Sequence, residues 1–204
     1  MAFNDNVFLN CPFDDDYKSM FDSIVFTIKN CGFNVRCARE EEDSGVVRIE
    51  KILKIISKCK YGIHDISRAE LDPNTKLARF NMPLELGIFI GAKIFHNIKS
   101  KRKYLILDIS PFRYRDFISD IAGSDIKAHN KEPRKAVLAI RDWLDSKTRR
   151  NIPASSKIWE RFETFTAELP YYSQQKNWDE KELSYQNYLA LVVAWIEDNP
   201  TYYP

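Results

Sequence analysis

The hydrophobic positions of the chain alternate between short uninterrupted runs and longer stretches at helical spacing. Short apolar runs are typical of strands buried on both faces, and a spacing of three to four residues indicates helices with one buried face. The runs predict strands at residues 7–9, 34–38, 61–65, 103–108 and 126–129. The spaced stretches predict helices at residues 16–31, 46–59, from about 81 onward, 114–121 and 133–144.

This alternation predicts one α/β fold class. It is a flavodoxin-like three-layer domain with a five-stranded, mostly parallel sheet in the order 2-1-3-4-5 and helices on both faces. In such a sheet, ligands bind outside the carboxyl ends of the strands, beside the point where the strand order reverses. We therefore expect chemistry in the loops after the first, third and fourth strands.

The pattern changes after Lys147, where polar and Pro-containing sequence leads into two aromatic-rich helical stretches. We expect the α/β domain to cover residues 1–147 and a helical C-terminal extension, residues 148–204, to pack on it. Aromatic side chains contribute much of the buried area in any core. The aromatic residues of the extension therefore favour packing over a ligand site.

Composition argues against several classes of function. The chain has 204 residues, of which 44% are hydrophobic and 29% charged, as in globular proteins. A net charge of +2 lacks the basic excess that nucleic-acid binding usually requires. The acidic N-terminus is unlike a signal peptide, and no apolar run approaches the roughly 18 residues of a membrane span. We expect a cytoplasmic protein with neither a membrane nor a nucleic-acid partner.

The four cysteines lie at positions 11, 31, 37 and 59. They form no CxxC pair and have no His at metal-ligand spacing, so the sequence predicts neither a zinc site nor a disulfide framework. Free cysteine behaves as a small hydrophobe, and we expect buried, reduced thiols. No metal or cofactor is expected.

Two acidic residues follow the third predicted strand. Asp65 ends that strand, and we expect Glu85 in the first turn of the next helix, so both carboxylates could converge on one cleft. The partial positive charge of a helix N-terminus favours an ionised Glu85, the state that a carboxylate nucleophile needs. Structural roles are the alternative, because a first-turn acid stabilises a helix and a strand-terminal Asp often caps a loop.

The segment 61–93 resembles the signature of the nucleoside 2-deoxyribosyltransferase-like superfamily. In that signature an apolar strand ends in Asp, here Asp65, and after a loop a glycine-flanked Glu-Leu-Gly, here residues 85–87, opens a helix. The superfamily is similar in fold and site to Toll/interleukin-1 receptor (TIR) domains that cleave NAD. The first strand and its Asn10-Cys-Pro-Phe13 continuation also resemble this superfamily, and the match covers about the first 145 residues.

The resemblance implies that the Glu85 carboxylate attacks the anomeric carbon of a ribosyl or deoxyribosyl group and displaces the base, with net retention. Asp65 would hold sugar hydroxyls or deliver a proton to the departing base. The other substrate-binding residues that it implies include Asn10 and Asn81 on the sugar or base and Arg39 on a phosphate. The complete set of these residues is Asn10, Pro12, Phe13, Arg39, Ser67, Asn81 and Met82.

The sequence departs from the family's pattern in its first loop and in its first strand, where Phe8 and Leu9 stand in place of a Tyr that orients the nucleophile in the transferases. The first loop lacks phosphate-binding glycines and carries three consecutive acids, Asp14 to Asp16, which repel an anion and favour a different substrate. His64 adjoins Asp65 but points to the opposite face of its strand, which favours a packed histidine over a general base.

The resulting expectation is a retaining N-glycosidase that cleaves the base–ribose bond of NAD or another nucleotide. The nucleotide is a small-molecule substrate rather than a cofactor, and we expect a homo-oligomer. The resemblance places such proteins in bacterial stress or antiphage defence. The alternatives are a nucleoside 2-deoxyribosyltransferase and a non-catalytic nucleotide-sensing or assembly module.

Overall fold

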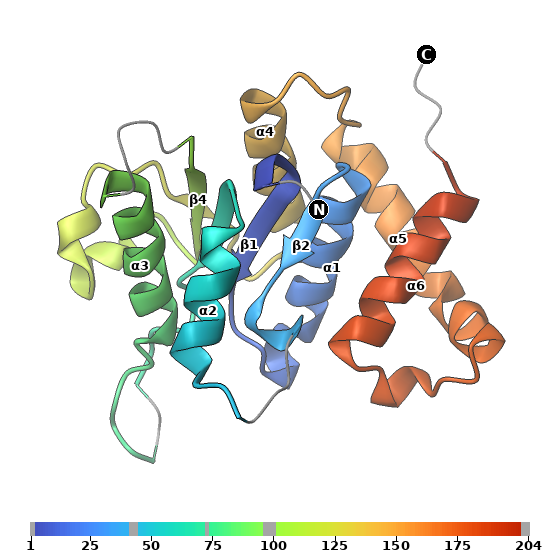
Figure 1. Cartoon of the computed structure of the whole chain (residues 1–204), viewed down its shortest axis with the longest axis horizontal. Coiled ribbons are helices and arrows are strands. Elements are labelled where there is room, and N and C mark those ends of the chain that lie inside the picture. The colour runs from blue at the N-terminus through green and yellow to red at the C-terminus, as the bar shows by residue number, and fades with distance from the viewer. Residues whose placement is uncertain (1–2, 41–44, 72–73, 96–100, 201–204) are drawn as a thin grey trace.

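The computed structural model describes residues 3–40, 45–71, 74–95 and 101–200 (Figure 1). Its strands are β1 (Asn6–Asn10), β2 (Asn34–Arg36), β3 (Tyr61–Asp65), β4 (Lys103–Asp108) and β5 (Lys127–Ala128). Its α-helices are α1 (Lys18–Asn30), α2 (Arg48–Ser57), α3 (Asn81–Phe95), α4 (Pro133–Lys147), α5 (Ser155–Gln175) and α6 (Tyr185–Asp198). Short 3-10 turns are η1 (Phe3–Asp5), η2 (Asp15–Tyr17), η3 (Ala38–Glu40), η4 (Arg113–Asp116), η5 (Ser119–Ile121) and η6 (Glu180–Glu182).

All five strands are parallel, in the order β2-β1-β3-β4-β5, which confirms the predicted fold class. The central register pairs Leu9 with Ile63 and Ile63 with Leu105. Because all strands run the same way, their carboxyl ends form one edge of the sheet and their amino ends the other. The strand order reverses between β1 and β3.

Side-chain alternation along the strands assigns each residue to one of two helical layers. Val7 and Leu9 of β1 belong to a hydrophobic cluster with α1 and α4. Phe8, between them, packs instead with Ile55 of α2 and Phe89 of α3. The same alternation operates in β3, and it decides where the polar residues at its carboxyl end point.

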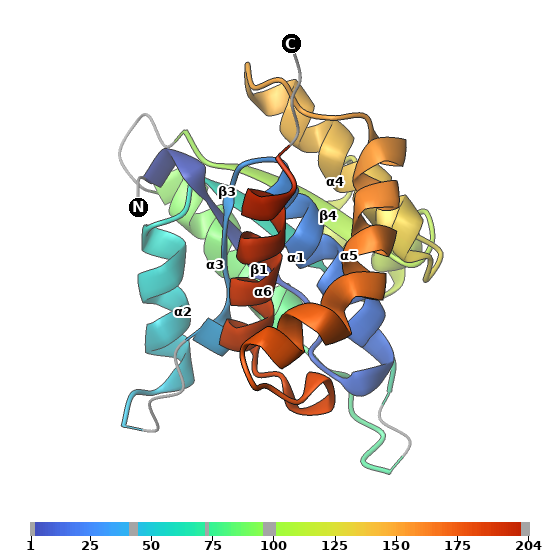
Figure 2. The same ribbon diagram turned by 90° about the vertical axis from the view of Figure 1, so that its right-hand side faces the viewer.

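The C-terminal helices form an additional layer outside α1 (Figure 2). The ring centroid of Phe26, on α1, lies 5.4 Å from that of Phe165 on α5 and 5.7 Å from that of Trp195 on α6. These residues belong to the same hydrophobic cluster as Leu9 of the sheet. The aromatic residues of the extension therefore pack against the α/β layers, as the sequence pattern indicates.

Element boundaries depart from the prediction where short-range hydrogen bonds intervene. The first turn before α1 is the 3-10 turn η2, because the side chain of Asp14 accepts the backbone N–H of Tyr17. The helix predicted at 114–121 is two 3-10 turns, η4 and η5, because Phe117 between them has a φ of −137° and leaves the helical region. Residues 41–44, between the strand predicted at 34–38 and the helix predicted at 46–59, lie outside the described residues.

All four cysteines are buried free thiols. Within residues 3–40, 45–71, 74–95 and 101–200, no three His, Cys, Asp or Glu side chains are grouped as metal ligands. No helix in these ranges has both the length and the apolar character needed to traverse a bilayer.

Two glycines offer a matched test of the packing between β3 and α3. A Cβ atom at Gly62 would lie 2.6 Å from His64 Nε2 and 2.9 Å from Phe89 Cζ, whereas one at Gly87 would meet no atom within 4 Å. We expect Gly62→Ala to lower the free energy of unfolding by about 1–3 kcal/mol through overpacking. Gly87→Ala should raise it by up to about 1 kcal/mol because alanine is the better helix former. Urea denaturation of both variants measures the difference, and equal stability would contradict this account of the packing.

Candidate functional site

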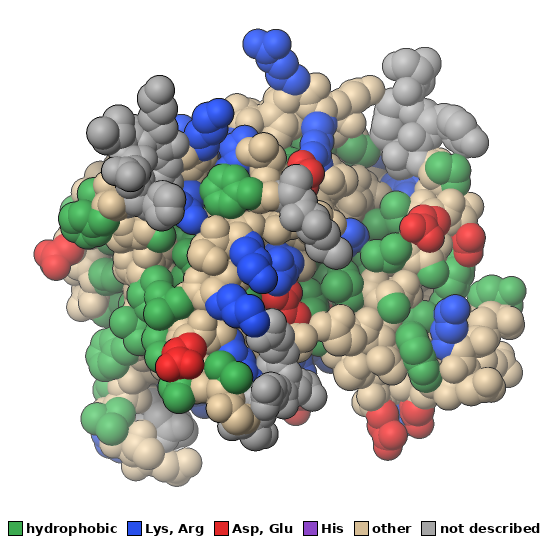
Figure 3. Space-filling view, viewed as in Figure 1, with side chains coloured by type: hydrophobic (Ala, Val, Ile, Leu, Met, Phe, Trp, Pro, Cys, Tyr) green, Lys and Arg blue, Asp and Glu red, His purple; other side chains and the backbone are tan. Residues whose placement is uncertain are grey.

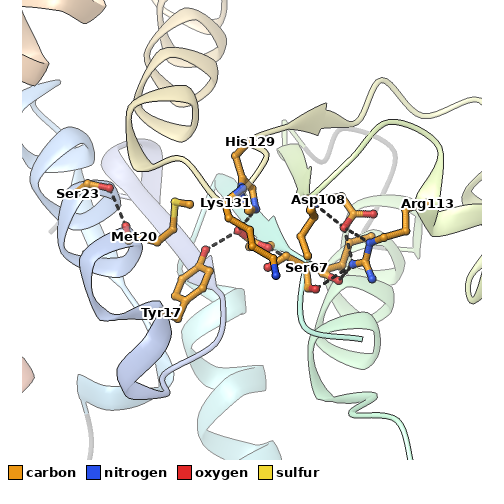
Figure 4. Close-up of polar contacts among 11 residues, drawn as sticks. Tyr17, Met20, Ser23, Ser67, Asp108, Arg113, His129 and Lys131 are labelled. Carbon is orange, nitrogen blue, oxygen red and sulfur yellow. Dashed lines mark hydrogen bonds and ion pairs between the residues drawn. The ribbon is translucent and has the colours of Figure 1, made fainter. Parts of the chain in front are cut away.

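The carboxylate of Asp65 is fully buried at the carboxyl end of β3. Figure 4 shows Tyr17, Ser67 and His129, which come from different segments, gathered at this edge of the sheet. The Tyr17 hydroxyl donates to Oδ2, and the Ser67 backbone N–H donates to Oδ1 at 2.8 Å. His129 Nε2 lies 3.1 Å from Oδ2. These donors come from the segments after β1, β3 and β5, so the carboxylate joins three of the loops at this edge.

The hydrogen bonds determine the charge state of this group. His129 Nδ1 accepts the backbone N–H of Lys131 at 3.0 Å, which orients the other ring nitrogen, Nε2, toward Asp65. Burial raises the pKa of Asp65, but hydrogen bonding and charge interaction with His129 and hydrogen bonds from Ser67 and Tyr17 outweigh it and lower the pKa. Asp65 is therefore an ionised, positioned group.

A cavity of about 380 Å³ adjoins this network, and three of the side chains around Asp65 line it: Tyr17, Ser67 and His129. Arg68 and Lys131 also line it. Its size is in the range of small-molecule pockets. Because its lining comes from the loops after β1, β3, β4 and β5, the cavity lies at the edge where an open parallel sheet binds ligands.

Arg113 holds the loop after β3 against β4. Its Nη2 and Nε atoms lie 2.5 Å and 2.9 Å from Asp108 Oδ1. The same Nη2 donates to the carbonyls of Ile66 and Ser67, both at 3.0 Å. This clamp fixes the backbone that presents the Ser67 N–H to Asp65.

Glu85 lies in the second turn of α3, and the expectation of a first-turn position was wrong. The helix begins at Asn81, because the carbonyl of Phe80 already accepts the N–H of Leu84 at 2.9 Å. Glu85 is only 4% exposed, and in the part of the chain that the structure describes its carboxylate receives no hydrogen bond. Burial raises its pKa to about 7, with Arg48 acting in the opposite direction. Burial therefore raises the pKa of Glu85 by more than the partial positive charge of the helix N-terminus was expected to lower it.

Asn10 links β1 to the start of α3. Its Nδ2 donates to the carbonyl of Met82 at 2.9 Å and lies 3.1 Å from His64 Nδ1. Its Oδ1 is buried without a hydrogen-bond partner among the described residues. Since Met82 and Glu85 are three residues apart, they share a face of α3. Burial lowers the pKa of His64 to about 3, so His64 is a neutral, packed histidine.

The two carboxylates do not converge on a common cleft, contrary to the expectation from the sequence. Asp65 points into the layer of α1 and α4, where Tyr17 and His129 hold it. Glu85 belongs to α3, which packs on the opposite face with α2. Burial raises the pKa of Cys11, just after β1, and the charges of Cys37, Asp65 and Glu85 raise it further, so both acids are near this thiol. The two acids therefore belong to different layers at the same edge of the sheet.

The other predicted site residues fall into separate groups. Arg39 is exposed, and its guanidinium lies 5.5 Å from the ring centroid of Phe13; both line a second cavity of about 220 Å³ beside the C-terminal extension. Pro12 is buried, and Asn81 is the exposed first residue of α3. Ser67 acts through its backbone on Asp65. Asn10 and Met82 are thus the predicted residues that the fold brings to the side of Glu85.

Tyr17 and His129 are important residues that the sequence pattern did not reveal. Tyr17 matched the apolar positions of a helix, and His129 ended the weakest predicted strand. The strand order supplied one usable signal, because it brings the carboxyl ends of the third and fifth strands to the same edge. A histidine there can face a buried Asp that ends a strand two positions away in the sheet.

No family model matches the chain, and no curated protein matches it in sequence. The resemblance of residues 61–93 therefore stays an expectation. The geometry of Asp65 and Glu85 is the evidence on which a functional proposal has to rest.

Removing the Tyr17 hydroxyl tests the network around Asp65. We expect Tyr17→Phe to lower the free energy of unfolding at pH 7 by about 1–3 kcal/mol, because a buried carboxylate loses a donor. The folded protein lowers the pKa of Asp65, so this stabilisation exists above the unfolded pKa near ~3.9 and disappears as the pH falls through the folded value. Urea denaturation at pH 7 and pH 3 should show the deficit shrinking in acid. Tyr171→Phe, at a 60% exposed tyrosine, is the control and should match wild type.

Removing the charge of Glu85, the buried acid on α3, should stabilise the protein, whereas Tyr17→Phe should destabilise it. Folding raises the pKa of Glu85 from 4.5 to about 7, so its ionisation destabilises the fold increasingly between these pH values and by a constant amount above them. Glu85→Gln should be more stable than wild type by up to about 3 kcal/mol at pH 8 and equally stable at pH 4. Thermal unfolding across this range measures the effect. Glu70→Gln, at an exposed position, should show no such pH dependence.

Proposed function

We propose that the protein cleaves the N-glycosidic bond of a nucleotide, with Glu85 as the nucleophile and NAD as the preferred substrate class. The observation that carries this proposal is a buried carboxylate at the ligand-binding edge of the sheet with no hydrogen bond among the described residues. An acid held in this way destabilises the fold, and such perturbed groups concentrate at functional sites. Asp65 acts only by positioning the loops after β1, β3 and β5.

The charge states favour a cationic leaving group. Asp65 is kept ionised and fully buried, and His64 is neutral, so neither supplies a proton to a departing neutral base. Nicotinamide in NAD is a pyridinium cation and leaves as a neutral molecule without protonation. Its positive charge beside Glu85 also favours the ionised carboxylate, since an opposite charge lowers the pKa of an acid. This supports NAD over a neutral deoxynucleoside.

The reaction would proceed in two displacements. The Glu85 carboxylate forms a bond to the anomeric carbon, and the bond to the pyridinium nitrogen breaks with its electron pair going to nicotinamide. Water then attacks the same carbon, the glycosyl ester bond breaks, and a proton passes to solvent. The nearby carboxylate stabilises the oxocarbenium-like transition state of each step. The unpaired Oδ1 of Asn10 is suited to accept a hydrogen bond from a sugar hydroxyl.

Product release tests the assignment of Glu85. The full chain is incubated with NAD, nucleoside monophosphates and deoxynucleosides, and released base is measured by chromatography. We expect nicotinamide release from NAD, and a loss of about 100-fold or more in Glu85→Gln, because the amide is a poor nucleophile. Glu163→Gln, at an exposed acid of α5 in the C-terminal extension, should retain wild-type activity.

The pH dependence and the products distinguish the alternatives. The value of kcat/KM should fall as the pH decreases below about 7, where Glu85 becomes protonated. Equal base release by wild type and Glu85→Gln would refute the nucleophile. Transfer of the sugar to a second base would identify a transferase, and tight nucleotide binding without any product would identify a nucleotide-sensing module.

A further inference from the structure

The amino edge of the sheet, opposite the candidate site, carries concentrated positive charge. Two recesses of about 680 Å³ and about 280 Å³ lie there and share Lys147, the last residue of α4. We call this surface the basic edge. The Lys and Arg side chains that line it are Lys60, Lys93, Lys103, Lys127, Lys147, Arg149 and Arg150. Lys127 and Arg150 form ion pairs.

The acids of the basic edge are already neutralised. Its two acidic side chains are Asp5, which pairs with Arg150, and Asp125, which pairs with Lys127 at 2.9 Å. Among the ion pairs of the described ranges, none involves Lys103, Lys147 or Arg149. With both acids paired, the remaining Lys and Arg side chains leave the basic edge with a net positive charge. Such a concentration raises the local density of anions and steers their association.

The fold assembles this surface from segments that are distant in sequence. The N–H of Lys103 donates to the carbonyl of Lys60 at 2.9 Å, which brings the starts of β3 and β4 together. The end of α4 then adds Lys147, and the segment after it adds Arg149. Figure 3 shows Lys and Arg side chains along the upper edge of the molecule, where the strands begin. Two short basic stretches of the sequence, residues 101–103 and 147–150, contribute to this site, and the fold adds Lys60 and Lys93 from elsewhere in the chain.

Aromatic rings alternate with these cations. Lys60 Nζ lies 5.1 Å from the ring centroid of Tyr61, and Lys93 Nζ lies 4.8 Å from that of Tyr104. The rings of Tyr61 and Trp143 meet edge to face at 5.9 Å. Tyr104 and Trp143 line the smaller recess and are only partly buried.

We propose that the basic edge binds single-stranded nucleic acid. Phosphates would contact Lys103, Lys147 and Arg149, and bases would stack on Trp143 and Tyr104. Cations track the backbone in such proteins and aromatic rings bind unpaired bases, each base contributing about 1–3 kcal/mol. Rings recessed between lysines suit a splayed base better than a flat lipid surface or a stacked duplex. This binding is separate from the proposed cleavage at Glu85 and lies at the other end of the strands.

Fluorescence anisotropy with the full chain tests this proposal. The probes are fluorescein-labelled oligo(U) and oligo(dT) of about 15 nucleotides, a length near the upper site size of such domains. We expect binding at low salt whose logarithmic affinity falls linearly with the logarithm of salt concentration, with a slope of about −0.7 for each phosphate contacted. An abasic oligomer of the same length should bind at least about tenfold more weakly, because it offers no base to stack.

Charge reversal locates the binding surface. The double variant Lys103→Glu/Lys147→Glu should lose at least about tenfold in affinity and give a shallower salt slope. The matched control is Lys176→Glu/Lys181→Glu, which makes the same change in net charge at exposed positions of the C-terminal extension. Unchanged circular dichroism and melting temperature establish that both double variants fold.

Three results would overturn the proposal. They are no binding at low salt, an equal loss of affinity in the two double variants, and equal binding of abasic and base-containing oligomers. The last result would leave only a polyanion surface. Base release from NAD is measured separately, so failure of either proposal leaves the other intact.

Discussion

Side-chain alternation along β3 is the constraint on which the organisation of this protein depends. Gly62 and His64 face α3, whereas Ile63 and Asp65 face α1 and α4. Parallel pairing with β1 and β4 on both sides locks this register, because a slip of one residue would exchange every buried side chain between the two layers. The position of Asp65 relative to Glu85 follows directly. One acid is held on each side of the sheet's carboxyl edge.

Asp65 and Glu85 are both buried, but their pKa values are shifted in opposite directions. Burying a charge is costly unless hydrogen bonds or an opposite charge compensate it. Asp65 has donors from Tyr17, Ser67 and His129, so its pKa is lowered and it stabilises the loops that it joins. Glu85 has no such donors among the described residues, and its pKa is raised to about 7. An acid that destabilises the fold is a stronger candidate for a functional residue than one that stabilises it.

Parallel topology also separates the charges of the molecule. Every helix that follows a strand in the α/β layers returns to the amino edge, where its C-terminal partial negative charge favours cations. This accounts for a lysine at the end of α4, at Lys147. It does not account for Lys60 and Lys103, which stand before and at the start of strands. The acids Asp14 to Asp16, by contrast, follow β1 at the carboxyl edge. The two ends of the sheet are therefore suited to different ligands.

The sequence by itself determined the layers of this protein. Apolar runs delimited β3 and β4 to the residue, and apolar spacing located the helices, because burial on one or two faces imposes a local periodicity on the chain. Weakly periodic segments, such as the two-residue β5, were less accurately predicted. Tertiary structure alone decided that Tyr17 and His129 hold Asp65, that Glu85 is buried on the other side, and that lysines from four segments share one edge. These are contacts between residues far apart in the chain, and their energies depend on burial and distance, which no local pattern of residues encodes.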